Sequence, residues 1–365
     1  MGNGLHRAIA AGALAAVAAF TAPALAQDAM EHANSPFFEN LLYHNQVYGI
    51  EMVGQRLKMA EAFRPPVPKD LVPQLQRMER RDFARFRGTL AQRQPALEGN
   101  LAAALRAVMA AVEAGKPVTA EVAKARALLD EAAKIVVDQK MKDAPANKAA
   151  VLANLLVAND GVAEAFEDSI REIWGFPNGW AAVRRVEVLW AELTPLARPE
   201  QRDEAAGILD LLKTSFYPRP EPKIPFPKEE AEDVEALAHQ LLSIIEAVTD
   251  STLYMGRDFA KLSTYLAEVT TLACQAYARG QDLIGAEGIH AVLDPYRVNL
   301  AGALDLIAPE LRKQATLVFP RLVEVEYDFY EGFENVPPDT RPLSNAQLCG
   351  ELVTVFTEAQ KVLKQ

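Results

Sequence analysis

The stretch VYGIEMVGQRLKMAEAF, residues 47–63, places apolar residues at intervals of three to four positions. At about 100° per residue, Ile50, Val53 and Leu57 share one face of a helix. The same period continues from Ser35 to the end of the chain, where Ala, Leu, Glu, Lys, Arg and Gln dominate and alternating β-branched residues are few. The sequence therefore predicts an all-α protein.

Breaks that contain proline divide this helical pattern. RPPVP, GKPVT, DAPAN, GFPNG and LARPE each carry a proline, which disfavours helix in the residue before it. Short breaks between helices of about 15 to 30 residues favour antiparallel neighbours, and hence helical bundles. Helices are predicted at 36–63, 69–92, 95–114, 119–141, 145–174, 178–193, 199–214, 229–278, 281–293, 297–307, 309–332 and after 344.

One segment interrupts the helices more strongly than the other breaks. FYPRPEPKIPFPKEE, residues 216–230, holds five prolines within ten positions. Extended polyproline II is the natural conformation of such a stretch. We therefore expect two helical regions, 27–215 and 229–365, joined by a Pro-rich linker at 216–228. The alternative is a strap that lies along a single bundle.

The N-terminus has the pattern of a secretory signal peptide. Arg7 is followed by an apolar run from Ala8 to Phe20, and Ala24-Leu25-Ala26 provides an A-x-A cleavage site. A membrane anchor would need roughly 18 or more apolar residues, and this run is shorter. We expect residues 1–26 to be removed and the mature chain to be periplasmic if the source is a Gram-negative bacterium. No later stretch is expected to span a membrane.

The charge of the chain bears on its partners. The 365 residues carry a formal net charge of −11, with both signs interspersed, which opposes a broad phosphate-binding surface. Nucleic acid is therefore not an expected partner, whereas cations and basic partners suit an acidic surface.

The chain has two cysteines, Cys274 and Cys349. In an oxidising compartment they can form a disulfide, and the alternative is a pair of small buried thiols. The sequence has no CxxC and no Cys-His cluster, so it supports neither a redox motif nor a zinc knuckle.

One face of the first helix carries polar side chains over three turns. They are His44, Tyr48, Glu51 and Gln55, with Met52 and Met59 beside them. Imidazole, phenol and carboxylate are ligands for an iron or copper ion, and thioethers suit the softer ion. His44 and Glu51 are about 10 Å apart along the helix axis, so a second helix would have to complete the site. The alternative is a histidine hydrogen-bonded inside the bundle beside core methionines.

A second candidate site is an acidic run, LLVANDGVAEAFEDSI, residues 155–170. It places four carboxylates within nine positions, Asp160, Glu164, Glu167 and Asp168. On a helix, most of them point away from the apolar stripe that begins at Val162, which indicates solvated surface. Carboxylate oxygens on such a surface can still hold a hard cation weakly, so the acidic run can bind metal or be only surface.

A longer stretch around the acidic run resembles a known class of proteins. DGVAEAFEDSIREIWGFPNGWAAVRRVEVLWAEL, residues 160–193, has an acidic GVAE-aromatic-E helix, a short turn, and then GWAAV leading into LW. This pattern resembles periplasmic helical segments that accompany high-affinity iron permeases of bacteria. The resemblance implies that Glu164 and Glu167 occupy acidic positions of that class. The R-E-G-L-E motif of the permease itself and the imelysin G-x-H-x-x-E motif are both absent.

Motifs of common catalytic sites are also absent from the sequence, among them G-x-S-x-G, H-E-x-x-H and a glycine-rich phosphate loop. We therefore expect a secreted, non-enzymatic binding or accessory protein. Its sharpest functional hypothesis is uptake of iron or another metal ion beside an envelope or membrane permease partner. The alternative is a structural or protein-interaction component of the cell envelope.

Overall fold

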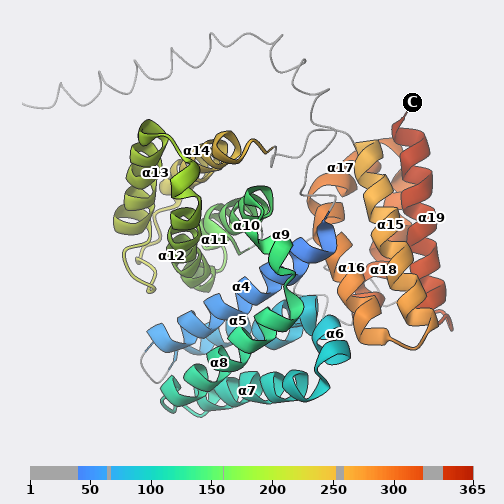
Figure 1. Ribbon diagram of the computed structural model, residues 1–365, viewed down its shortest axis with the longest axis horizontal. Coiled ribbons are helices and arrows are strands. Elements are labelled where there is room, and N and C mark those ends of the chain that lie inside the picture. The colour runs from blue at the N-terminus through green and yellow to red at the C-terminus, as the bar shows by residue number, and fades with distance from the viewer. Residues whose placement is uncertain (1–39, 64–66, 159, 252–258, 324–339, 365) are drawn as a thin grey trace, which may run out of the picture.

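The computed structural model describes residues 40–63, 67–158, 160–251, 259–323 and 340–364. Within these ranges every regular element is a helix, so the all-α prediction is confirmed. The predicted signal peptide, residues 1–26, lies outside the described residues. Figure 1 shows three groups of helices arranged around one central helix, α4.

The first group contains α4 and the helices that follow it, drawn in blue to blue-green across the lower half of Figure 1. Leu57 of α4 and Phe86 of α6 belong to one fully buried apolar cluster shared by these helices. The elements are α4 (Leu41–Ala62), a 3-10 turn (Lys69–Leu71), α5 (Val72–Arg77), a π turn (Met78–Asp82), α6 (Ala84–Arg93), α7 (Pro95–Glu113) and α8 (Thr119–Val136).

The second group lies on the other side of α4. Its helices α10 and α12 both pack against α4, and α14 packs against α10 and α11. The elements are α9 (Gln139–Asp143), α10 (Pro145–Val157), α11 (Val162–Asp168), a 3-10 turn (Ile173–Gly175), α12 (Phe176–Leu193), a 3-10 turn (Thr194–Leu196), α13 (Pro199–Leu211), a π turn (Leu212–Phe216), a 3-10 turn (Lys228–Glu230) and α14 (Ala231–Thr249).

The third group forms the orange and red side of Figure 1. Its helix α15 packs along α19, and a disulfide joins Cys274 of α15 to Cys349 of α19, with 5.4 Å between their Cα atoms. The capping box at Ser344 begins α19, where Gln347 N donates to Ser344 Oγ at 3.3 Å. The elements are α15 (Phe259–Ala278), α16 (Asp282–Pro295), a π turn (Tyr296–Leu300), α17 (Ala301–Ile307), α18 (Pro309–Val323) and α19 (Asn345–Leu363).

Three predicted helices are divided in the structure: 119–141 breaks between α8 and α9, and an aspartate in the left-handed region lies at each of the other two divisions. Asp160, at φ 61°, stands between α10 and α11, and Asp250, at φ 49°, ends α14. Aspartate is among the few residues besides glycine that adopt this conformation readily. The predictions of unbroken helices at 145–174 and 229–278 were therefore wrong at these points.

The proline-rich segment packs against helices that precede it in the sequence. The ring of Phe226 lies 5.0 Å from that of Phe166 and 5.9 Å from that of Phe176, and Tyr217 Oη donates to Val162 O at 2.7 Å. One apolar cluster includes residues on both sides of the segment, and α16 packs against α4 and α6. An arrangement of two regions joined by a linker is thus not confirmed.

One stretch of the described residues has the length and apolar composition of a membrane span, although none was predicted after the leader. It is Pro145–Asp168, which includes α10 and α11, and 76% of its apolar window is buried inside the protein. Core helices and signal sequences meet the same requirements, so the stretch is weak evidence for a span.

Candidate ligand-binding groove

The polar stripe predicted on α4 is present, but its members have separate partners. His44 Nε2 lies 2.9 Å from Asn147 Oδ1, and Asn147 Nδ2 donates to Met141 O at 2.9 Å, so His44 is hydrogen-bonded inside the protein. Tyr48 is buried beneath Arg85, whose guanidinium carbon lies 5.2 Å from the centre of its ring. Burial raises the pKa of the Tyr48 phenol.

The remaining predicted ligands of α4 also lie apart. Glu51 forms a bidentate ion pair with Arg185 of α12, with oxygen to nitrogen distances of 2.5 and 2.7 Å. Met52 and Met59 are both fully buried, in two different apolar clusters. Among the described residues, no group of three or more His, Cys, Asp or Glu side chains stands close enough to hold a metal ion. Within the described residues, His44 and Glu51 of the stripe thus belong to no such group.

The acidic run separates into two environments. Glu167 and Asp168 are exposed and Glu164 is half-buried, as expected of the solvated side of α11. Asp160 instead lies before the helix, and it is fully enclosed by the protein. Its two carboxylate oxygens are the centre of a buried ionic network, which the sequence analysis did not anticipate.

Three arginines surround Asp160. Arg56 Nη2 and Arg77 Nη1 lie 3.1 and 2.9 Å from its oxygens, Arg81 forms a further short contact, and Asn178 Nδ2 donates to it at 3.0 Å. Burial alone would raise the pKa of Asp160, but Arg81, Arg56 and Arg77 together hold that pKa well below its ordinary value. These contacts join α4, the segment 72–82 and α12, and so fix the position of α12 relative to α4.

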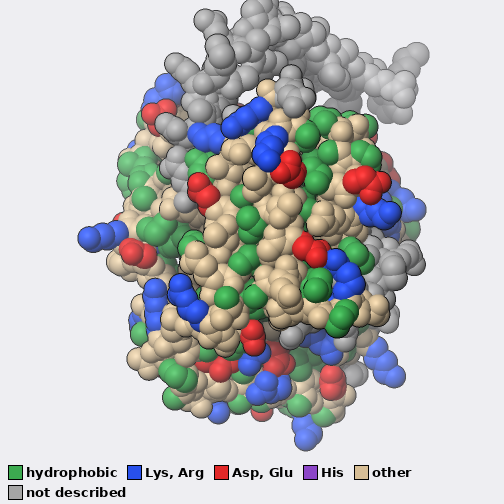
Figure 2. Space-filling view, turned by 90° about the vertical axis from the view of Figure 1, so that its right-hand side faces the viewer, with side chains coloured by type: hydrophobic (Ala, Val, Ile, Leu, Met, Phe, Trp, Pro, Cys, Tyr) green, Lys and Arg blue, Asp and Glu red, His purple; other side chains and the backbone are tan. Residues whose placement is uncertain are grey.

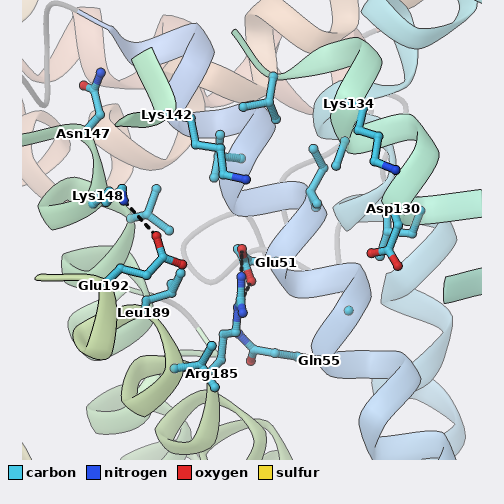
Figure 3. Close-up of a pocket in the computed structure, with 18 of the residues that line it drawn as sticks. Glu51, Gln55, Asp130, Lys134, Lys142, Asn147, Lys148, Arg185, Leu189 and Glu192 are labelled. Atoms are coloured by element: carbon cyan, nitrogen blue, oxygen red, sulfur yellow. Dashed lines mark hydrogen bonds and ion pairs between the residues drawn. The ribbon is translucent and has the colours of Figure 1, made fainter. Parts of the chain in front are cut away.

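Beside this network, the helices leave a cavity of about 670 Å³ between α4, α8, α10 and α12, with α9 at one end. Its lining follows α4 from Tyr43 to Lys58, which corresponds to about 22 Å of helix at 1.5 Å per residue. We call this cavity the α4 groove. Figure 3 shows Glu51 and Gln55 pointing from α4 into it, toward Arg185 on α12.

Gln55 is the most unusual side chain of the groove. It is 3% exposed, and neither its Nε2 nor its Oε1 has a hydrogen-bond partner among the described residues. Most buried polar side-chain atoms in proteins are paired, because an unpaired buried amide costs about 1 to 3 kcal/mol. A buried amide that lines a cavity and has both a donor and an acceptor to offer is therefore a candidate ligand-binding group.

The lining of the α4 groove is basic, although the chain as a whole is acidic. Seven of its residues are Lys or Arg and three are Asp or Glu. The basic ones are Lys58, Arg126, Lys134, Lys142, Lys148, Arg184 and Arg185, and the acidic ones are Glu51, Asp130 and Glu192.

Two of the three acids already neutralise basic neighbours, Glu51 with Arg185 and Glu192 with Lys148 at 2.8 Å. The groove thus retains positive charge in excess of these pairs. The sequence predicts Gln55 and Glu51 on one face of α4, but it does not predict that α8, α10 and α12 surround that face.

Comparison with known proteins adds no further constraint. No family model matches the chain, and no curated protein or solved structure matches it.

Proposed function

We propose that this chain is a non-enzymatic binding protein that holds a small molecule in the α4 groove. The observation that carries the proposal is the buried Gln55 amide, which faces the groove with its donor and acceptor unpaired. A cavity of about 670 Å³ lies within the range of small-molecule sites, and its lining combines aliphatic side chains with charged and polar ones.

The cellular setting belongs to the same proposal. The leader-like residues 1–26 support export to the periplasm. The resemblance of residues 160–193 to helical segments that accompany iron permeases supports an accessory role beside a membrane permease. We do not assign metal binding to His44, Tyr48 and Glu51. His44 and Glu51 are bonded to other side chains, and Tyr48 is buried beneath Arg85.

A second candidate function is that of a structural or interaction component of the envelope. It is favoured by exposed apolar side chains on the third group of helices, Leu272 of α15 and Leu306 and Ile307 of α17. Figure 2, which views the molecule from the right-hand side of Figure 1, shows hydrophobic side chains scattered among both kinds of charge on that face. The apolar residues are not gathered there into one continuous patch, so the groove is the better-supported site.

Native mass spectrometry of the chain purified from its own host tests the binding proposal. A bound small molecule should add mass under native conditions and be released on unfolding. The variant Gly54→Phe should lose it, because Gly54 lines the groove and a Cβ there meets only Leu129 Cδ2, at 3.9 Å, so the larger ring enters the cavity.

The matched control is Gly99→Phe on α7, where a Cβ meets nothing within 4 Å, and this variant should keep the molecule. Absence of added mass in the parent, or its retention by Gly54→Phe, would contradict the binding proposal and favour the interaction protein.

A further inference from the structure

We propose that the ligand of the α4 groove is an elongated organic anion with an amide beside its acidic head, which is the chemistry of an N-acyl amino acid. The inference rests on the proposed binding function of the groove. It assigns the acidic head to the end of the groove near Lys58 and Arg184, the amide to Gln55, and the apolar chain to the walls along α4.

The head end of the groove holds two partly buried cations, Lys58 and Arg184, whereas the lining residues Lys134 and Lys142 are exposed to solvent. Lys58 has no acidic partner within ion-pair distance among the described residues, and its ammonium stands over the Trp180 ring at 5.5 Å. Arg184 lies over the same ring at 4.5 Å and donates to the backbone oxygens of Trp180 and Tyr217, at 2.9 and 3.0 Å. These backbone bonds fix the guanidinium without neutralising its charge.

The acids near this end are occupied elsewhere. Glu187, which acts on Arg184, is bonded to Lys213 at 2.5 Å, and Glu61 is bonded to Arg126 at 2.8 Å. Burial lowers the pKa of Lys58, and the like charges of Arg184, Arg126 and Arg185 lower it further. An anionic group at this position would be attracted by the same charges that now repel one another.

Gln55 stands one helical turn before Lys58, on the same side of α4. Its Nε2 needs an acceptor and its Oε1 needs a donor, and the carbonyl oxygen of a trans secondary amide supplies the acceptor. An amide adjacent to the acidic head of the ligand would therefore meet Gln55 while the head meets Lys58. A plain alcohol or a simple fatty acid would satisfy this geometry less completely.

The rest of the groove is suited to an extended chain. From Gln55 toward Tyr43 the walls carry aliphatic side chains from all four helices. They are Val47 and Ile50 of α4, Leu129 and Ala133 of α8, Val151 of α10, and Val188 and Leu189 of α12. An apolar chain that lies along these residues would have the side that faces them removed from water.

Calorimetric titration with four probes of similar chain length tests the inference on the whole chain. The probes are N-decanoylglycine, decanoate, decanol and decyltrimethylammonium. We expect N-decanoylglycine to bind most tightly and decanoate roughly tenfold more weakly, a ratio that corresponds to about one hydrogen bond at Gln55. Decanol and decyltrimethylammonium should bind more weakly still, because neither carries a negative charge.

Three variants separate the parts of the claim. Gln55→Leu should lower the affinity for N-decanoylglycine to that for decanoate and leave decanoate unchanged. Lys58→Gln should weaken both anions about tenfold and leave decanol unchanged. Lys124→Gln, at an exposed lysine of α8 outside the lining of the groove, is the matched control and should change none of them.

If all four probes bind equally and Gly54→Phe abolishes their binding, the inference of an anionic ligand is overturned. The groove would still be a binding site. Failure of N-decanoylglycine to bind saturably would also overturn the inference, and native mass spectrometry would then decide the binding function independently. Loss of affinity in Lys124→Gln rather than in Lys58→Gln would contradict the assigned position of the head.

Discussion

At the scale of the residue, Asp160 is constrained through both its backbone and its side chain. It adopts a left-handed backbone conformation and is enclosed by three arginines. Sequence periodicity could not find it, since the neighbouring acids of the run are solvated and the arginines come from residues 56–81. The Asp-Gly pair at 160 and 161 is the one local signal of a helix break, because both residues favour turns.

Asp160→Asn should destabilise the protein by about 3 kcal/mol, because it removes a buried carboxylate that pairs with Arg56 and Arg81, whose charges Asp82 then balances only in part. Asparagine also accepts the left-handed conformation, so the backbone is not at issue. Urea denaturation followed by circular dichroism measures the change. Asp168→Asn, on an exposed carboxylate of the same run, should shift stability by less than about 0.5 kcal/mol, and an equal effect of both variants would contradict the buried network.

The same carboxylate predicts how stability depends on pH. The pKa of Asp160 is lowered in the folded protein, so its stabilising contribution is complete above about pH 5 and declines as the pH falls through its unfolded value of about 3.9. Between pH 6 and 3, the free energy of unfolding should therefore fall less steeply for Asp160→Asn than for the parent. The control variant Asp168→Asn should not show this difference. Parallel curves for parent and Asp160→Asn would refute this assignment.

At the scale of the element, the sequence predicted most helices close to their observed ends, because the period of three to four and the prolines at breaks are local features. The polar face of α4 was predicted as well, including Gln55. The α4 groove was not predicted, because α8, α10 and α12 form its other walls. Periodicity shows which face of a helix is apolar, but it does not show which helices pack against that face. The mixed stripe on α4 was consequently interpreted as metal ligands, although Asn147 and Arg185, which engage His44 and Glu51, lie on other helices.

Gly88 lies where α6 packs against α16, and Gly99 on α7 provides a control for it. A Cβ at Gly88 of α6 would stand 2.6 Å from the carbonyl carbon of Leu283 and 2.7 Å from Ile284 N, so the two helices touch backbone to backbone there. Gly88→Ala should destabilise the protein by roughly 1 to 3 kcal/mol or more. Gly99→Ala on α7, which meets nothing within 4 Å, should stabilise it by about 0.5 to 1 kcal/mol. Opposite signs in thermal or urea unfolding are the expected result, and a harmless Gly88→Ala would contradict the close contact.

At the scale of the whole molecule, the described helices share apolar packing across the proline-rich segment. Phe226 of that segment lies against Phe166 and Phe176, and α14 and α16 pack on helices that precede it. Proline content alone predicts an extended conformation but not whether the extended chain is free or packed. The aromatic residues within the segment, Phe216, Tyr217 and Phe226, are the part of the sequence that provides the packing.

This packing predicts cooperative unfolding. All three tryptophans, Trp174, Trp180 and Trp190, precede the proline-rich segment, so their fluorescence reports on the first part of the chain, whereas far-ultraviolet circular dichroism reports on all helices. The two probes should give one coincident urea transition. A fluorescence transition clearly separated from the dichroism transition would support two independent regions instead.

The central claim is that the α4 groove binds its ligand through Gln55, and the side-chain amide of Gln55 can be observed directly. In a ¹⁵N spectrum of the labelled protein, the Gln55 amide signal is identified by its loss in Gln55→Leu. Addition of N-decanoylglycine should move that signal progressively to saturation, because Nε2 gains an acceptor that it lacks in the free protein. A Gln55 signal that stays in place while the ligand binds and other signals move would contradict the account.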